Sequence, residues 1–402
     1  MTEVSKYLQA QKARLRILMI SGAFYPKVDG SVMAVANIAE ELARRGDEVT
    51  LLTRGYDFND SASWNGIPVE RVHQRGFSLG HRLWLAVDQT RRGVQLHRRK
   101  RFDVIHAHGF ASLFSAAVIG LVGKVPVVVT FHGLQRLWSR QWNFRSHMIF
   151  AFLLPFEGTL ARRATFVVAQ SEKLKTVLIR LYGIRSEAVI VFPNPVDTRS
   201  FPFCEPSQSR TVLFVGTIGA IYAPDILVRA ARMVLQRVPD AKFVLVGTGP
   251  AEGTVKRLAE DESVASSVRL VGRVTSREEL RRYYASSRML VIPFRGQGGY
   301  ILTLAALESM SVGRPVIIGY EVDQSVGVIS TASEPLTLSK QIVEWLQLDD
   351  KAYSSLSRAA RSIAEGCSSE VVARRLEETY CSLARSGFAP SPMDSNRARG
   401  MN

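Results

Sequence analysis

The 402-residue sequence has few of the features that mark secreted, disulfide-bonded or membrane-spanning proteins. Its three cysteines, Cys204, Cys367 and Cys381, are scattered and match no metal-binding or redox spacing. No apolar run is long enough to cross a bilayer, because the best candidate, residues 111–129, is interrupted by Lys124 and Pro126. The first 16 residues lack the apolar core of a signal peptide. We therefore expect a protein of the reducing cytoplasm.

Acidic residues are scarce in the first half of the chain. Residues 1–200 contain 28 Lys and Arg but only 15 Asp and Glu, a net charge of +13, whereas the rest contains 24 and 21, a net charge of +3. No acidic residue occurs between Asp103 and Glu157. A basic half beside a nearly neutral half predicts an anionic partner, either a membrane surface or a nucleic acid.

Two stretches of the first half, Arg71–Arg101 and Leu134–Phe156, combine basic side chains with Trp, Phe and Leu. This combination is typical of segments that lie at a membrane interface. For the second stretch, the alternative is a core helix with a solvated basic face. No nucleic-acid-binding signature occurs. We therefore favour an anionic membrane surface and expect no nucleic-acid partner.

The alternation of apolar runs and helical patterns predicts an α/β protein with two domains. Arg16–Ile20 reads as a buried strand, followed by a helix that Gly46 closes and by a second strand at residues 49–52. A second strand–helix series begins at Val212. We expect two doubly wound domains in tandem, with ligands in the cleft between them at the carboxyl ends of the strands. The predicted boundaries are a first domain at 1–193, a linker at 194–209, a second domain at 210–368, a C-terminal helix at 369–387 that packs back on the first domain, and a disordered tail at 388–402.

Residues 293–319 form the most distinctive local pattern. A glycine-rich loop leads into an apolar helix with one acid, Glu308, and then into the strand Val316–Ile318. A helix that begins on a glycine loop offers free amide groups and the positive end of its dipole, which suits a phosphate. The alternative is a core helix with one acid at its edge.

Eight segments, in order, resemble glycosyltransferase family 4: FYPKVDGSVMAVANIAEELARRGDEVTLLT, FDVIHAHGF, VVVTFHG, VIVFPNPVDTRSF, LFVGT, FVLVGTGP, VRLVGRV and ALESMSVGRPVI. The resemblance implies the GT-B fold, in which two Rossmann-like domains face each other across a cleft. It also implies retaining transfer of a hexose, mannose- or glucose-type, from a GDP- or UDP-linked sugar to a lipid-linked or glycan hydroxyl. Neither a metal nor another cofactor is implied. The enzyme would be peripheral, at the cytoplasmic face of the membrane.

The resemblance also assigns roles to single residues. His132 would face the transferred sugar as a catalytic residue, with Gln297 as a second one, whereas His106 and His108 are left open. Glu308 would hold the ribose hydroxyls, because a carboxylate accepts two hydrogen bonds from a diol. The full set of donor-binding residues is Gly30, Gly216, Thr217, Gly247, Gly249, Arg295, Gly298, Gly299 and Glu308.

Three positions depart from the family pattern. Thr217 stands where the family has an arginine, Tyr222 where it has a lysine, and Tyr300 where it has its first glutamate. If the loop carries three extra residues, Gln297 replaces that glutamate and Arg295 lies near the phosphates. Two other functions stay open: a catalytically silent GT-B protein that acts as a binding or scaffold partner of an active transferase, and an enzyme that epimerises or phosphorolyses sugars.

Overall fold

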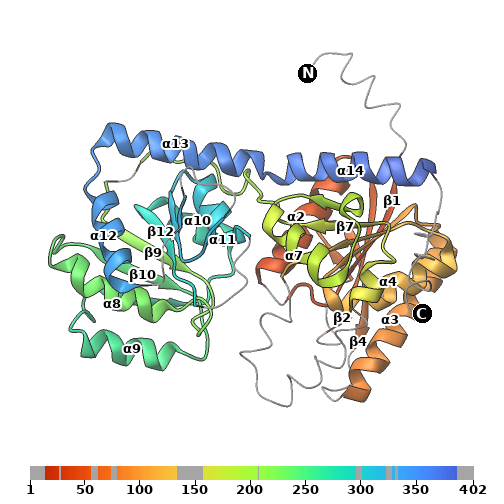
Figure 1. Cartoon of the computed structure of the whole chain (residues 1–402), viewed down its shortest axis with the longest axis horizontal. Helices are drawn as coiled ribbons and strands as arrows, with labels where there is room; N and C mark the ends of the chain where they lie inside the picture. Colours follow the sequence, from red (N-terminus) through yellow and green to blue (C-terminus); the bar gives the residue numbers. More distant parts are fainter. Residues whose placement is uncertain are drawn as a thin grey trace, which may run out of the picture. The chain divides into compact units, whose positions relative to one another are not determined.

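The computed structural model describes residues 14–26, 29–55, 62–73, 79–133, 157–206, 208–295, 301–322, 328–330 and 334–386. The chain divides into two compact units (Figure 1). The first unit contains residues 1–170, 175–192 and 373–402, and the second contains residues 171–174 and 193–372. Each unit is built on its own β-sheet.

The sheet of the first unit has the order β3-β4-β2-β1-β5-β6-β7-β8. All its neighbours pair in parallel except β3 and β4, and Ile17 on β1 lies between Val49 on β2 and Val104 on β5. The central strands are mainly apolar because helices cover both faces of the sheet. The strands are β1 (Arg16–Ser21), β2 (Glu48–Gly55), β3 (Ser63–Trp64), β4 (Ile67–His73), β5 (Val104–His108), β6 (Val127–Thr130), β7 (Phe166–Ala169) and β8 (Val189–Val191).

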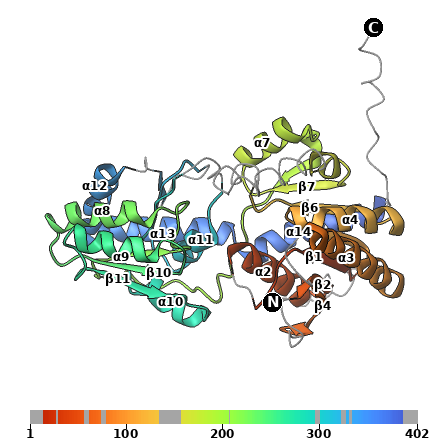
Figure 2. The ribbon, with the colours of Figure 1, turned by 90° about the horizontal axis from the view of Figure 1, so that it is seen from below.

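The helices of this unit are α2 (Gly30–Arg44), α3 (Leu79–Lys100), α4 (Phe110–Gly123), α7 (Glu172–Tyr182) and the part of α14 (Ser369–Ser386) from Ala373 onward. Right-handed crossovers place α2 on one face of the sheet and α3 and α4 on the other (Figure 2). Arg45, which follows α2, donates through Nη2 to Glu377 Oε2 on α14 at 2.8 Å. The C-terminal helix is therefore tied to the first unit.

The second unit has six parallel strands in the order β11-β10-β9-β12-β13-β14. Helices α8, α9 and α12 cover one face, and α10, α11 and α13 cover the other, as right-handed crossovers require. The strands are β9 (Thr211–Val215), β10 (Lys242–Val246), β11 (Val268–Gly272), β12 (Met289–Ile292), β13 (Val316–Ile318) and β14 (Val328–Ser330). The helices are α8 (Pro224–Leu235), α9 (Glu252–Asp261), α10 (Arg277–Ala285), α11 (Leu304–Ser311), α12 (Pro335–Leu346) and α13 (Asp350–Gly366).

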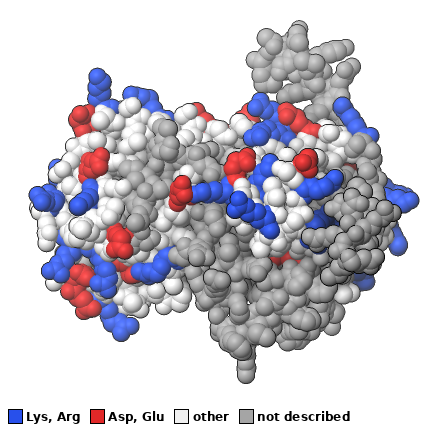
Figure 3. Space-filling view, viewed as in Figure 1, with Lys and Arg blue, Asp and Glu red and all other residues white. Residues whose placement is uncertain are grey.

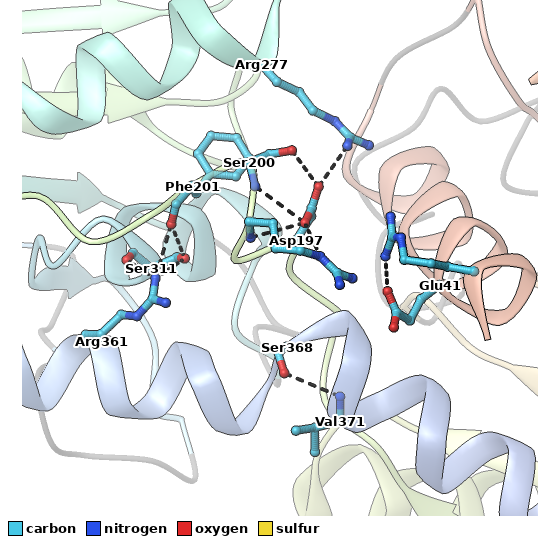
Figure 4. A network of polar contacts seen from close by, with 11 residues as sticks. Glu41, Asp197, Ser200, Phe201, Arg277, Ser311, Arg361, Ser368 and Val371 are labelled. Atoms are coloured by element: carbon cyan, nitrogen blue, oxygen red, sulfur yellow. Dashed lines mark hydrogen bonds and ion pairs between the residues drawn. The ribbon is translucent and has the colours of Figure 1, made fainter. Parts of the chain in front are cut away.

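The segment predicted as a linker packs against the second unit. Phe201 is buried, and its carbonyl accepts hydrogen bonds from Ser311 Oγ and from Arg361 Nη1 (Figure 4). Burial of an aromatic ring with two polar anchors fixes these residues to the unit's surface. The predicted α/β class with two doubly wound domains is confirmed. The cleft predicted between the domains stays a prediction, and the predicted C-terminal tail lies outside the described residues.

Candidate functional site

Two loops of the second unit, at the carboxyl ends of β9 and β10, are joined by backbone hydrogen bonds. Gly216 N donates to Val246 O at 3.0 Å, and Ile218 N donates to Thr248 O at 3.0 Å. The carboxyl ends of parallel strands are where doubly wound domains bind ligands. Thr217, at the predicted arginine position, lies exposed between these bonds.

Two glycines predicted to bind the donor, Gly247 and Gly249, lie against the neighbouring loop. Gly247 has φ +142°, and a Cβ atom there would lie 1.8 Å from Gly216 O. A Cβ atom on Gly249 would lie 2.3 Å from Ile218 O. Only glycine permits such close backbone contacts. The structure therefore explains both glycines by loop packing, and their donor role stays a prediction.

Arg295 is held beside the loop that follows β9. Its amide donates to Ile221 O at 2.8 Å, and its guanidinium forms two hydrogen bonds, at 3.2 and 2.7 Å, with the carboxylate of Asp225 at the start of α8. The hydrogen bond that Arg295 donates to Asp225 raises the pKa of Arg295. The guanidinium is exposed, and Arg295, Asp225 and Gly219 line a groove of about 570 Å³. Tyr222, at the predicted lysine position, packs its ring on Phe294, with 6.3 Å between centroids.

Glu308 lies on α11, which begins after Thr303 caps the helix by accepting a hydrogen bond from Ala306 N. Only 8% of Glu308 is exposed, and its Oε2 accepts a hydrogen bond of 3.0 Å from Tyr284 OH. Among the described residues, Oε1 makes no hydrogen bond. One carboxylate oxygen is thus fixed by the protein, and the other is available to a ligand.

Burial raises the pKa of Glu308 to about 7, while the hydrogen bond from Tyr284 and the charge of Arg277 act in the opposite direction. Arg277 itself donates through Nη1 to Asp197 Oδ2 at 3.0 Å, and Asp197 is further bound by Ser200 (Figure 4). The carboxyl of Glu308 is therefore close to half ionised at neutral pH.

In the first unit, polar side chains collect at the carboxyl ends of three adjacent strands. His106 and His108 lie on the same face of β5, because strand residues two apart point the same way. Thr130 ends β6 and His132 follows it, while Gln170 follows β7. This edge of the sheet is the predicted location of His132.

Both ring nitrogens of His132 have partners. His108 Nδ1 lies 3.1 Å from His132 Nε2, and Gln170 Nε2 lies 3.2 Å from His132 Nδ1. When Gln170 donates to Nδ1, the proton of His132 is on Nε2 and points at His108, whose own proton is then on Nε2. His108 Nε2 is buried and has no hydrogen-bond partner among the described residues. His108 and Gln170 therefore fix the tautomer and the orientation of His132.

His106 belongs to a separate part of this cluster. Its Nε2 lies 2.7 Å from Thr130 Oγ1, and its Nδ1 lies 2.6 Å from the hydroxyl of Tyr380 on α14. Both nitrogens face protein groups, so His106 links the sheet to the C-terminal helix. In the described structure His106 therefore stabilises the packing of the C-terminal helix on the sheet.

The histidines of the cluster are neutral at pH 7. Burial lowers the pKa of His132 to about 4 and that of His106 to about 3, and it lowers the pKa of His108 well below its usual range. Asp29 acts in the opposite direction on His132 but does not offset burial. Neutral imidazoles donate and accept hydrogen bonds without adding charge to the site.

Gly30 is the first residue of α2, and Asp29 caps the helix. Asp29 Oδ1 accepts hydrogen bonds from Ser31 N and Val32 N, both at 3.0 Å. The N-terminal end of α2 was predicted to lie under the donor phosphates. Its first backbone amides already donate to the carboxylate of Asp29. This arrangement disfavours direct phosphate binding by those amides, and the donor role of Gly30 stays a prediction.

Several predicted positions lie outside the described residues: Gln297, Gly298, Gly299 and Tyr300, and the stretch Leu134–Phe156. Sequence reasoning missed Gln170 and Tyr284 and left His108 open. The position of Gln170 directly after a strand was a usable signal, as was the His-x-His spacing of β5. Tyr284 lies within α10 and had none. No group of three or more His, Cys, Asp or Glu side chains suited to a metal occurs in the described part of the chain.

Comparisons with known proteins indicate the class of protein. The family model described as Glycosyltransferase Family 4 matches residues 28–200, and the model described as Glycosyl transferases group 1 matches residues 209–347. A D-inositol 3-phosphate glycosyltransferase from Frankia alni is 27% identical over 326 residues, which cover 74% of this chain and 78% of the relative.

Solved structures with the same fold cover nearly the whole chain. Sucrose-phosphate synthase from Thermosynechococcus elongatus superimposes with a TM-score of 0.76 and 20% identity, over 93% of this chain and 100% of that one. Anabaena HepE, in complex with UDP and glucose, superimposes with a TM-score of 0.71 and 19% identity, over 92% of this chain and 100% of HepE.

The two sheets and these structural neighbours define the GT-B fold. The model of glycosyltransferase family 4 matches most of the first unit and the group 1 model matches most of the second, so the chain is a glycosyltransferase of the family 4 type.

Proposed function

We propose that this glycosyltransferase moves a hexose, mannose- or glucose-type, from a UDP- or GDP-linked sugar to a hydroxyl of a lipid-linked or glycan acceptor at the cytoplasmic face of a membrane. The observation that carries the donor class is Glu308, a buried acid with one oxygen fixed by Tyr284 and the other available for a ribose diol. The complex of HepE with UDP and glucose supports a nucleotide-sugar donor. The name of the Frankia alni relative supports a hydroxyl-bearing acceptor.

In this proposal the second unit binds the nucleotide. Glu308 accepts hydrogen bonds from the ribose, and the diphosphate lies along the loop after β9. Arg295, held beside this loop at Ile221, supplies the positive charge that Thr217 and Tyr222 do not. Asp225 fixes the direction of the guanidinium and partly neutralises it. We therefore expect weaker phosphate binding than two free cations would give.

The first unit contributes His132 to the transfer step. The bond between the anomeric carbon and the phosphate oxygen breaks, and a bond between the same carbon and the acceptor oxygen forms. The acceptor proton passes to the leaving phosphate, so that no metal or protein base is required. His132 is held neutral between His108 and Gln170, and it hydrogen-bonds a sugar hydroxyl by exchanging its Nε2 contact with His108 for one with the substrate, while Gln170 keeps its hold on Nδ1. Retention of anomeric configuration follows from the family resemblance.

A screen of nucleotides and nucleotide sugars by thermal unfolding tests the donor class. A ligand present at about 100 times its Kd stabilises the folded state by about 2.7 kcal/mol, which raises the Tm of a unit of this size by about 5 °C or more. We expect such a rise with UDP or GDP compounds and its loss in Glu308→Ala. No rise with any of them would contradict a nucleotide-sugar donor and favour the silent partner protein, for which Thr217 and Tyr222 are the supporting observations. Consumption of the sugar substrate without an acceptor would favour an epimerase or phosphorylase.

A further inference from the structure

Helix α4 is apolar on its exposed face as well as on its buried one. Its apolar side chains Phe114, Leu121 and Val122 are 45%, 60% and 57% exposed. Its two serines, Ser112 and Ser115, are fully buried. Surface helices of globular proteins normally bury the apolar stripe and expose the polar one. The sequence of α4 contains no charged residue that could make its outer face soluble.

The exposed apolar side chains of α4 follow one stripe of the helix, and the neighbouring helix α3 exposes one more apolar side chain. Phe114, Val118 and Leu121 follow the spacing of four and three residues that places side chains on one stripe of a helix. α3 packs beside α4, because a Cβ atom on Gly93 would lie 2.2 Å from Ile119, and α3 adds Val87, which is 61% exposed. We call this set, Val87, Phe114, Val118, Leu121 and Val122, the α3–α4 surface.

Basic residues gather where the two helices end. A Cβ atom on Gly123 would lie 2.9 Å from His97, so the C-terminal ends of α3 and α4 meet. Arg98, Arg99 and Lys124 are exposed there and have no acidic partner among the described residues. Figure 3 shows Lys and Arg side chains along the edge of the first unit on the side where Figure 1 draws α3 and α4. An apolar surface with a cationic end is complementary to a layer that is apolar inside and anionic at its rim.

We infer that the α3–α4 surface docks on an anionic lipid bilayer. The apolar side chains enter the boundary between headgroups and acyl chains, and the arginines and Lys124 contact lipid phosphates. α4 has 14 residues and is therefore about 21 Å long, shorter than the hydrocarbon core of about 30 Å, so it lies along the membrane.

This inference deepens the proposed function, because a lipid-linked acceptor would lie in the same bilayer. Its test needs no nucleotide sugar and no catalysis. A failure to bind vesicles would therefore contradict only this inference, whereas a failure to transfer sugar would contradict only the proposed function.

The experiment is co-sedimentation of the full chain with phosphatidylcholine vesicles that contain or lack phosphatidylglycerol. We expect binding to the anionic vesicles that falls at high salt, and little binding to phosphatidylcholine alone. The double substitution Leu121→Asp and Val122→Asp should lower the partition coefficient at least about tenfold. The matched control is Leu336→Asp on α12 of the second unit, where the leucine is 57% exposed, and it should bind like the wild type.

A second pair of variants tests the charge. Arg98→Glu should lower binding to the anionic vesicles by about fivefold for each unit of charge changed, and the control Arg237→Glu in the second unit should not. All substituted side chains are exposed, so circular dichroism should show unchanged folding. Equal binding by the Leu121/Val122 variant and the wild type would overturn the inference. Absence of binding, with a dimer that this variant converts to monomer, would also overturn it and identify the surface as a self-association interface.

Discussion

The affinity for a nucleotide sugar should rise with pH because Glu308 must be ionised to accept two hydrogen bonds from the ribose. Burial raises the pKa of this carboxyl to about 7 in the free protein. With that pKa, about one tenth of the molecules are ionised at pH 6 and about nine tenths at pH 8. If only the ionised form binds tightly, the affinity increases up to about tenfold between these values, which corresponds to about 1.4 kcal/mol.

Calorimetric titration with the nucleotide sugar selected by the thermal screen measures this effect. A nucleotide sugar is preferable to the free diphosphate, whose terminal phosphate also titrates in this range. At pH 7 the binding should release about half a proton, which titrations in buffers of different ionisation enthalpy will detect. Glu308→Gln should bind with the weak affinity of the wild type at pH 6 and should show no pH dependence.

Tyr284→Phe provides the second control. The Tyr284 hydroxyl lowers the pKa of Glu308 by its hydrogen bond, so its removal should move the midpoint of the affinity curve to higher pH. An affinity that is flat from pH 6 to pH 8 in the wild type would refute the role of Glu308. So would a pH dependence that persists unchanged in Glu308→Gln.

Three further predictions concern other parts of the two units. His108→Ala should lower kcat by about 10- to 100-fold with little change in donor KM, because His132 loses the group that orients it. His108→Asn restores a polar atom near the Nδ1 position and should recover part of the loss. Gly247→Ala should destabilise the second unit by about 3 kcal/mol or more, because the new methyl group would meet a backbone carbonyl and the residue would keep a strained φ. In the control Gly253→Ala on α9, the new methyl group enters open space, so the substitution should be neutral or stabilise by up to about 1 kcal/mol. Arg295→Gln should weaken donor binding by about tenfold, the loss of one charge-assisted hydrogen bond to phosphate.

These predictions are checked by steady-state kinetics, chemical unfolding and calorimetric titration, in that order. Full activity of His108→Ala would show that His132 needs no partner. Equal stability of the Gly247 and Gly253 variants would contradict the loop packing. Unchanged donor affinity of Arg295→Gln would place the diphosphate elsewhere, and the control Arg282→Gln on α10 should leave the affinity unchanged because that side chain is exposed and pairs with Glu278.

The fold could be predicted closely from the sequence because hydrophobic periodicity, turn residues and the order of strands and helices along the chain are similar in the two units. The short β-branched run at residues 316–318 forms a buried strand, as predicted, and Gly313, with φ +85°, follows the end of α11 in a conformation that glycine favours. Contacts between residues far apart in the chain were not predictable. The hydrogen bond between Tyr284 and Glu308 and the placement of Tyr380 on His106 depend on packing that no local pattern encodes.

The candidate site shows the same limit. Glu308 lies within α11 and His132 lies just after β6, the helix and the strand in which the sequence pattern placed them. The close approach at Gly247 shows that a glycine in a ligand-binding motif can be required by loop packing alone. The capping of α2 by Asp29 was not foreseen, because a sequence pattern does not say which side chain occupies the free amides of a helix.

The most direct test of the account is transfer of labelled hexose from a nucleotide sugar to acceptor membranes by the purified chain. We predict that the label moves from a UDP- or GDP-linked sugar to the acceptor with release of one equivalent of nucleoside diphosphate, and that His132→Ala reduces the rate by about 100-fold or more while donor binding persists. Absence of transfer from every common nucleotide sugar, or an unchanged rate in His132→Ala, would contradict the account.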